Sequence, residues 1–161
     1  MSIEEILLLS AATLTGLLAG LFFGFEVCIN GALGRLKNSE YVAAMQSINI
    51  VIQNPIFFLS FFGPVVLLPL VTILYRDDTD SGRFALLLAA SILYVIGTFG
   101  LTVVGNVPLN NQLDKFDQTK ASADELAEAR IRYEKPWNRL HTIRTVASTI
   151  ALVCVIAAGI V

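Results

Sequence analysis

Four apolar stretches, each about as long as a bilayer is thick, constrain the fold of this chain more than any other feature of its sequence. A membrane-spanning helix needs about 20 predominantly apolar residues. The segments that meet this requirement are Ile6–Ile29, Pro55–Tyr75, Phe84–Val104 and Leu140–Val161. We expect helices, because an isolated strand cannot satisfy its backbone hydrogen bonds in lipid. The sequence therefore predicts an all-α, polytopic membrane four-helix bundle that forms one transmembrane domain over residues 1–161.

The composition agrees with a lipid environment and argues against other partners. The chain is 55% hydrophobic and 15% charged, whereas soluble domains average about 25% charged residues. Its net charge of −2 and the absence of a basic stripe give no reason to expect nucleic acid. Arg35 is the first basic residue, so no positive region precedes the first apolar stretch. We interpret that stretch as a retained span and not as a signal peptide.

An amphipathic surface helix is predicted between the first two spans, over Ser39–Gln53. Ser39 can cap its N-terminus, and Glu40 favours the first turn. The second span contains Pro64 and Pro69 and is expected to be kinked.

The connection between the third and fourth spans, Gly105–Asn138, is long and is predicted to be partly helical. Ser122-Ala123-Asp124-Glu125 has the S-x-x-E form of a capping box. The helix that begins there should carry a Glu128–Arg132 ion pair at i,i+4 spacing and end at Pro136.

The basic residues predict an orientation. Only Arg76 and Arg83 lie on the side of the second connection; the remaining basic residues follow the first or third span, and they are Arg35, Lys37, Lys115, Lys120, Arg130, Arg132, Lys135, Arg139 and Arg144. The positive-inside rule then places these two richer connections in the cytoplasm and both termini outside, in a plasma or inner membrane.

Small residues recur every four positions in the first span, at Ala12, Gly16, Gly20 and Gly24. Such a stripe lets another helix approach closely in a membrane. The partner could be a helix of the same bundle, which we favour, or a second subunit, which would make a homo-oligomer through Gly16, Gly20 and Gly24.

Polar residues gather at one end of the predicted bundle. The first and third spans end on the side where the second and fourth begin, and the surface helix lies there too. The residues that this topology brings together are Glu26, Asn30, Gln46, Asn49, Gln53, Asn106, Asn110, Asn138, His141 and Arg144. This convergence predicts the functional site.

Several of these residues also have purely structural interpretations. Asn30 and Asn106 lie next to glycines and could cap helix C-termini. Gln46, Asn49 and Gln53 share one helix face, and that face could be solvated. Trp137 and Arg139 are both typical of a membrane interface.

Glu26 and His141 are harder to explain structurally, because ionisable groups within a span are expensive and usually face a cavity or one another. An ion pair between Glu26 and Arg144 could join the first helix to the fourth. His141 is the only histidine, so a zinc or non-haem iron site with several histidines is not expected. One axial haem histidine stays open, but no motif supports it, and we expect no cofactor.

Two segments carry a family resemblance: Gly105–Asn110 (G-N-V-P-L-N) and Trp137–Thr145 (W-N-R-L-H-T-I-R-T), joined by Gly20–Phe25 and Asn30–Leu33 in the first span. With these motifs the chain resembles the anthrone oxygenase-like family of small four-helix membrane proteins, long catalogued as a domain of unknown function. The resemblance runs from about residue 10 to residue 155. Gly31 stands where many relatives have proline.

The resemblance implies four spans and suggests an activity. Fungal relatives oxidise anthrones to anthraquinones with O₂ and no evident cofactor. The first hypothesis is therefore a cofactor-independent oxygenase of a lipophilic phenolic or anthrone-type substrate, in which His141 is the base and Asn106, Asn110 and Arg144 stabilise an oxyanion. Substrate contacts are expected from Glu26, Asn30, Asn49, Gln53, Trp137 and Asn138. An apolar cavity would be lined by Phe22, Phe23, Phe57 and Phe58.

The second hypothesis is a non-enzymatic membrane protein that binds a lipid, a quinone-like molecule or a partner subunit. The two hypotheses differ in the depth of the site. Catalysis predicts an enclosed pocket that contains His141, Asn106 and Asn110, whereas a docking surface would leave these groups facing water.

Overall fold

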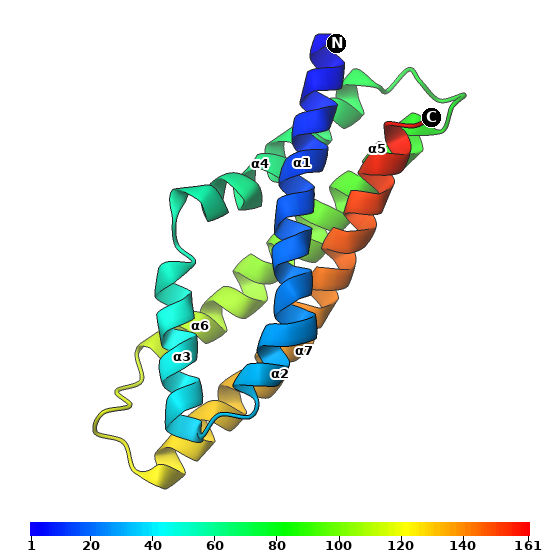
Figure 1. Ribbon diagram of the computed structural model, residues 1–161. Coiled ribbons are helices and arrows are strands. Elements are labelled where there is room, and N and C mark those ends of the chain that lie inside the picture. Colours follow the sequence, from blue (N-terminus) through cyan, green and yellow to red (C-terminus); the bar gives the residue numbers. More distant parts are fainter.

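The computed structural model describes residues 1–161, and its regular elements are all helical. Four helices are long and apolar enough to cross a membrane: Ile3–Leu33, Pro55–Leu74, Arg83–Asp114 and Ala123–Ala158. This confirms the predicted membrane helical bundle. Both termini lie at the same end of the bundle, at the top of Figure 1. We call this the apolar end and the opposite end the polar end.

The long helices are composed of shorter elements. The first contains α1 (Ile3–Gly24), the π-helical η1 (Phe25–Ile29) and α2 (Asn30–Leu33). The third contains α5 (Arg83–Ile92), the π-helical η2 (Leu93–Gly100) and η3 (Thr102–Asn106), and α6 (Val107–Asp114). The other elements are α3 (Asn38–Val51), α4 (Pro55–Leu74) and α7 (Ala123–Ala158).

The helix starts follow local capping chemistry. Ser122 accepts from the backbone N–H of Glu125 while the Glu125 carboxylate accepts from the Ser122 N–H, which confirms the predicted capping box. Asn54 caps α4 and is followed by Pro55, whose missing N–H needs no partner in a first turn. The prediction that Ser39 caps α3 is wrong: α3 begins at Asn38, and the Glu40 carboxylate accepts from the Lys37 N–H.

The predicted helix end at Pro136 is also wrong, because α7 continues through this residue to Ala158. A proline inside a helix removes one backbone hydrogen bond and costs about 3 kcal/mol. Buried residues on both sides of it, Tyr133 and Trp137, anchor α7 in the bundle and offset this loss. The predicted Glu128–Arg132 ion pair is confirmed on the exposed face.

The third long helix likewise extends beyond its predicted end, from Val104 to Asp114. Asn106 and Asn30 therefore lie inside continuous helices, and the interpretation of either as a helix C-cap is wrong. Because the helix continues, Asn106, Asn110 and Asp114 follow one another at i,i+4 spacing and lie along one side of it.

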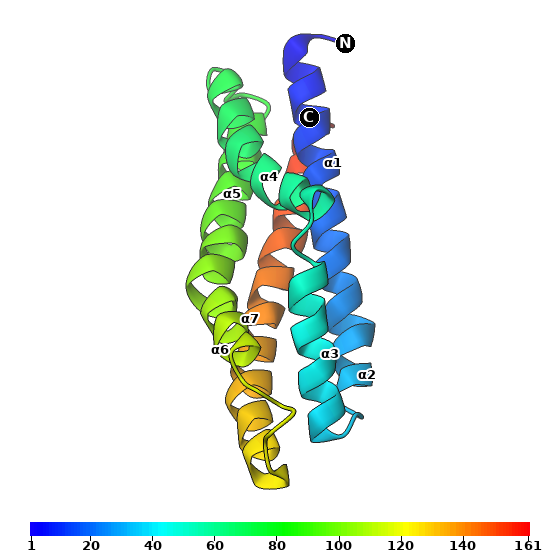
Figure 2. The same ribbon diagram turned by 90° about the vertical axis from the view of Figure 1, so that its left-hand side faces the viewer.

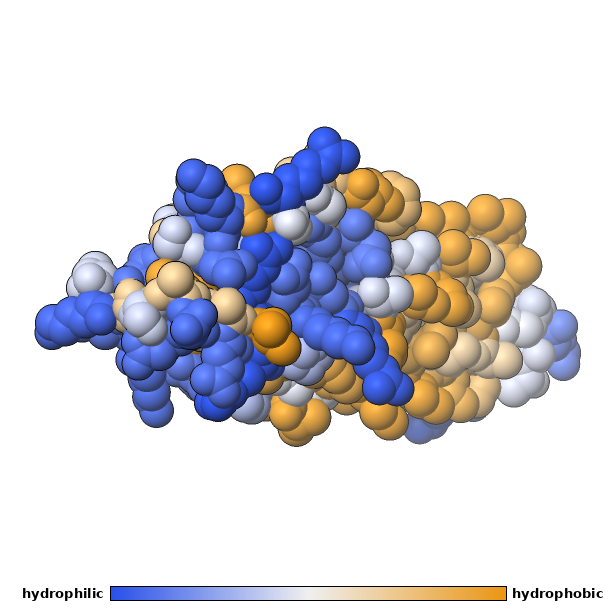
Figure 3. All heavy atoms as spheres, turned by 90° about the horizontal axis from the view of Figure 1, so that it is seen from below, coloured by the Kyte–Doolittle hydropathy of each residue, from blue (hydrophilic) through white to orange (hydrophobic).

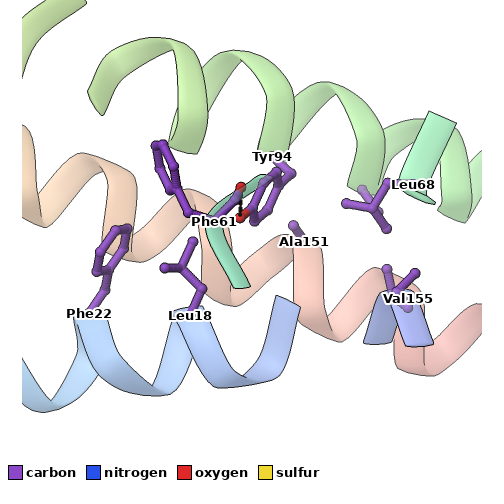
Figure 4. Close-up of a cluster of buried hydrophobic side chains, with 9 residues drawn as sticks. Leu18, Phe22, Phe61, Leu68, Tyr94, Ala151 and Val155 are labelled. Atoms are coloured by element: carbon purple, nitrogen blue, oxygen red, sulfur yellow. Dashed lines mark hydrogen bonds between the residues drawn. The ribbon is translucent and has the colours of Figure 1, made fainter. Parts of the chain in front are cut away.

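The core of the apolar end is formed by α1, α4, the third long helix and α7 around Leu18, Leu68, Tyr94 and Val155 (Figure 4). The Tyr94 hydroxyl donates to the carbonyls of Ser60 and Phe61 at 3.2 and 3.0 Å. The Ser60 carbonyl is free for this bond because Pro64, four residues on, has no N–H. Tyr94 thus satisfies a backbone group that a proline leaves unpaired in an apolar core, and α4 runs unbroken through both prolines.

At the polar end, α3 packs against α6 and α7 around Tyr41, Met45, Leu113 and Trp137. Figure 2 shows α3 beside the lower half of the bundle, below α4. Seen from below, hydrophilic side chains cover this end, and the hydrophobic surface begins beyond them (Figure 3).

Arg130 fixes the α2–α3 turn to α7. Its guanidinium donates to the carbonyls of Leu36 and Gly34 at 2.7 and 2.9 Å and pairs with Glu134 at 2.6 Å. It also lies over the ring of Tyr41, 4.5 Å from the centroid. Charge-assisted bonds of this kind hold the surface helix in place.

The first half of the small-residue stripe of α1 contacts the rest of the chain. Ala12 packs against the core of the apolar end, and the Leu152 side chain lies 3.5 Å from where a Cβ of Gly16 would lie. Gly20 and Gly24 have nothing within 4 Å. The favoured interpretation of the stripe as an intramolecular packing surface therefore holds for Ala12 and Gly16 and not for Gly20 and Gly24, and homo-oligomerisation through the stripe stays a prediction.

Candidate functional site

A cavity of about 450 Å³ lies where α4 and the third long helix meet α1, α3 and α7 near the polar end. Most of its wall is aromatic or aliphatic; the aromatic lining residues are Phe22, Phe25, Phe57, Phe58, Phe61, Phe62 and Trp137. Of the phenylalanines expected to line it, only Phe23 does not, because its side chain points outward from α1.

One side of the cavity opens towards the apolar surface of the molecule. Phe58 and Phe62 on α4, and Val103 and Val107 on the third long helix, line the cavity and are also exposed. Both pairs lie on helices that are long and apolar enough to span a bilayer. These exposed apolar side chains form one rim of the cavity.

Arg144 is the most unusual group in the cavity wall. Its residue is 7% exposed, and its guanidinium donates to His141 Nδ1 from Nε and Nη2, at 3.1 and 2.9 Å, and from Nη1 to Thr102 Oγ1 at 3.2 Å. It lies over the rings of Phe22 and Trp137, with centroids 4.2 and 5.2 Å away. No carboxylate pairs with it. A buried cation thus faces the cavity with only neutral partners.

His141 is enclosed beside this arginine and is 1% exposed. Its Nε2 lies 3.1 Å from the Phe22 carbonyl, which can only accept, so Nε2 carries the proton. Nδ1 is then unprotonated and accepts from Arg144. The imidazole stacks on Trp137, with centroids 4.8 Å apart and planes 8° apart, and meets the edges of Phe22 and Phe25. One tautomer in one orientation is therefore fixed.

The predicted ion pair between Glu26 and Arg144 is wrong. Arg144 points towards Thr102 on the third long helix, whereas Glu26 lies on the other side of His141. Glu26 Oε1 accepts from the Thr142 hydroxyl at 2.8 Å, and Oε2 lies 3.8 Å from His141 Nε2.

Amide groups line the polar side of the cavity or, as Gln46 does, lie on the same face of α3 beside it. Asn110 Oδ1 accepts from Trp137 Nε1 at 2.8 Å and from the Tyr133 hydroxyl at 3.0 Å. Asn49 is buried and donates to Asp114 Oδ1 at 3.0 Å. Gln46 donates to the carbonyls of Leu113 and Phe116. The interpretation of this α3 face as solvated is therefore wrong for Gln46 and Asn49.

The structure brings six of the ten predicted site residues to the cavity: Asn49, Gln53, Asn110, Trp137, His141 and Arg144. Asn106 is buried behind the wall, where it donates to the Trp137 carbonyl at 3.2 Å. Glu26, Asn30 and Asn138 do not line the cavity. Trp137 is buried, so its interpretation as an interfacial belt residue is wrong, whereas Arg139 is exposed.

Sequence reasoning missed Thr102 and Asp114, which also line the cavity. Asp114 lies four residues after Asn110. If the third helix had been predicted to continue to residue 114, this i,i+4 spacing would have placed Asp114 on the same side as Asn110. Both helices that contact the His141–Arg144 pair are π-helical at this level, in η1 and η3. Such widened turns are frequent at functional sites.

No group of three or more His, Cys, Asp or Glu side chains is placed to hold a metal ion. Both nitrogens of His141 already have protein partners. Asp114 and the neighbouring amides are oxygen ligands, but only one of them is a carboxylate.

The fold and the site define a multi-pass membrane protein with a largely apolar cavity that has a buried arginine in its wall. The family model described as anthrone oxygenase matches residues 57–154, more than half of the chain. The chain belongs to this anthrone oxygenase family. Asn110, Trp137, His141 and Arg144 all lie within the match, whereas the first-span motifs lie before it. No curated protein and no solved structure matches the chain.

Proposed function

We propose that the protein is an oxygenase that uses O₂ to oxidise a lipophilic phenolic or anthrone-type substrate. One observation carries this proposal: the buried guanidinium of Arg144 faces an apolar cavity and has no carboxylate partner. Arginine stays charged in proteins, and a buried unpaired charge costs several kcal/mol. A ligand that brings or develops negative charge compensates for this cost.

An anthrone-type substrate fits both the wall and the charge. Its apolar rings match the aromatic lining, and loss of a proton converts it into a delocalised oxyanion that Arg144 stabilises. Preorganised donors aimed at developing charge are worth most where water is excluded. The phenylalanines of the cavity wall, among them Phe57, Phe58 and Phe62, offer aromatic surface for flat rings.

The reaction balances without a further reductant. A base takes a proton from the substrate CH₂ group, and the resulting carbanion gives one electron to O₂. Recombination forms a C–O bond, protonation gives a hydroperoxide, and loss of water leaves a carbonyl. The sum is CH₂ + O₂ → C=O + H₂O. The positive charge of Arg144 favours both the enolate-like anion and the reduced oxygen species.

His141 is the base in this proposal, and Arg144 controls its availability. The Nδ1 lone pair accepts from two N–H groups of Arg144 in the structure. A substrate oxygen that accepts from Arg144 draws these donors away, and Nδ1 then faces the cavity. The base is exposed only when the oxyanion partner is in place.

Oxygen consumption tests the proposal. The purified protein is supplied with 1,8-dihydroxyanthrone while O₂ uptake and anthraquinone absorbance are followed, after its own spectrum and metal content are recorded. We expect catalysed uptake that falls at least 100-fold in Arg144→Gln and is retained in Arg139→Gln, an exposed arginine of the same helix. Binding of the anthrone without uptake would leave only a binding function. A Soret band or stoichiometric metal would replace the proposed mechanism.

A further inference from the structure

Glu26 lies directly behind His141, on the side away from the cavity. We propose that Glu26 is the temporary proton acceptor of the site, so that the imidazole connects the cavity to the surface between α1 and α7. This inference rests on the proposed function and adds to it a residue that does not touch the substrate.

The position of the carboxylate supports this role. Oε1 is held by the Thr142 hydroxyl at 2.8 Å, which fixes the carboxylate plane. Oε2 is buried, accepts no hydrogen bond and lies 3.8 Å from Nε2, whose N–H donates to the Phe22 carbonyl at 3.1 Å. Buried acceptors without donors are rare and call for an explanation. A proton delivered from Nε2 would satisfy Oε2.

The surroundings favour transfer in this direction. On the cavity side the imidazole faces the cation of Arg144, with Asp114 further along the same cavity wall. On the other side it faces Glu26, whose side chain is 30% exposed, and Arg139 lies exposed on α7 two residues before His141. A positive charge in front and a carboxylate behind push a proton from Nε2 outward.

The transfer has two coupled parts. The substrate C–H bond breaks, its electron pair stays on the substrate, and an N–H bond forms at Nδ1. At the same time Glu26 Oε2 closes the 3.8 Å gap and replaces the Phe22 carbonyl as the acceptor of Nε2–H; the Nε2–H bond breaks, and an O–H bond forms at Oε2. When the peroxide needs a proton, Nδ1 returns one and Glu26 restores the Nε2–H. The net reaction releases no proton, so Glu26 acts as a reservoir.

His141 is the only histidine, which makes the imidazole tautomer directly measurable. In ¹⁵N-histidine-labelled protein, one pair of ring signals reports the state of this residue. We expect Nε2–H in the free protein. Addition of 1,8-dihydroxyanthraquinone, a phenol that does not consume O₂, should move the proton to Nδ1 in the wild type and leave it on Nε2 in Glu26→Gln. The glutamine keeps the acceptor for Thr142, so the fold is preserved.

Turnover gives the second readout. In Glu26→Gln we expect kcat for the anthrone to fall at least about tenfold with an unchanged KM. The control Glu128→Gln, an exposed carboxylate of α7, should keep its kcat. In Glu26→Ala, added formate should restore part of the lost rate, which a purely structural role of Glu26 would not allow.

The outcomes separate the two proposals. If the wild type turns over the anthrone and Glu26→Gln has the same kcat, the proton reservoir is overturned. The same tautomer in both proteins with the probe bound would also overturn it. Either result leaves the oxygenase proposal standing. Wild-type protein that binds the probe and shows the Glu26-dependent tautomer shift, but consumes no O₂, would overturn the oxygenase and keep the proton path. Wild-type protein that neither consumes O₂ with the anthrone nor changes its tautomer with the probe would overturn both.

Discussion

The two ends of the bundle differ in how their buried polar groups are satisfied and in how closely their side chains pack. At the apolar end, Leu68, Leu87 and Val155 are fully buried, and the one buried tyrosine there has its hydroxyl bonded to carbonyls of α4. At the polar end, a cavity remains open, Arg144 is buried without a carboxylate, and Oε2 of Glu26 has no donor. One end is arranged for packing and the other keeps charge and space available for a ligand. Mutations at the two ends should therefore separate stability from activity.

Replacing Arg144 with methionine should show this separation most strongly. The variant loses the cation that stabilises the oxyanion, and we expect O₂ uptake to fall by about 10²–10³-fold. Its stability should be unchanged or higher, because replacing buried charged groups with apolar ones of similar volume is often neutral or stabilising. Anthrone-dependent O₂ uptake and unfolding in mixed detergents measure the two effects. A variant that loses both together would mean that Arg144 holds the fold.

At the apolar end, Leu68→Ala should have the opposite result. Leu68 is fully buried among α1, α4 and α7 side chains. Lipid is as apolar as the core, so the transfer part of the loss is small, but the cavity and lost dispersion contacts remain. We expect about 2 kcal/mol of destabilisation, with normal activity for each folded molecule. Activity that falls more than the folded fraction would show that packing at this end reaches the cavity.

Two glycines sharpen the comparison within the membrane. A Cβ at Gly97 would lie 2.8 Å from the Ala147 Cβ on α7, whereas a Cβ at Gly20 meets nothing within 4 Å. Gly97→Ala must push the third long helix from α7 and should destabilise by about 1–3 kcal/mol. Gly20→Ala should raise stability by up to about 1 kcal/mol, since alanine favours helix. Unfolding at two protein concentrations checks both. A destabilised, concentration-dependent Gly20→Ala would indicate that Gly20 packs against a second chain.

The length of each apolar stretch was enough to predict the membrane helices, because lipid forces every backbone group within a span into helical hydrogen bonds. The same reasoning placed Asn110, His141 and Arg144 at one end. The predicted helix ends were wrong at Pro136 and at residues 105–114. Proline and glycine suggested that the helices stop there, but both helices continue through these residues. Local propensity is a weak guide where tertiary contacts bury both sides of a proline.

Side-chain direction was the part that the sequence could not supply. Glu26 and Arg144 come from neighbouring helices and carry opposite charge, so an ion pair was the natural prediction. Their partners depend on how α1 and α7 are rotated, and that rotation places His141 between them. The π-helical turns that set the rotation have no signature in the linear pattern. The pairing of His141 with Arg144 and the unpaired Oε2 of Glu26 are therefore evident only in the three-dimensional structure.

The smallest expected effect concerns Tyr41, on the surface helix that closes the polar end. Burial raises the pKa of its hydroxyl, and the Glu134 carboxylate adds to this while Arg130 opposes it. A raised folded pKa means that the unfolded chain ionises first, so the contribution is fully present below about pH 10 and is lost as the pH rises further. The loss is limited to about 1.4 kcal/mol per pH unit. Hydrogen exchange of α3 between pH 9 and pH 11, compared with Tyr41→Phe, isolates it. If hydrogen exchange in α3 accelerates equally with pH in both proteins, the pH dependence comes from other groups, and Tyr41 contributes to stability only through packing.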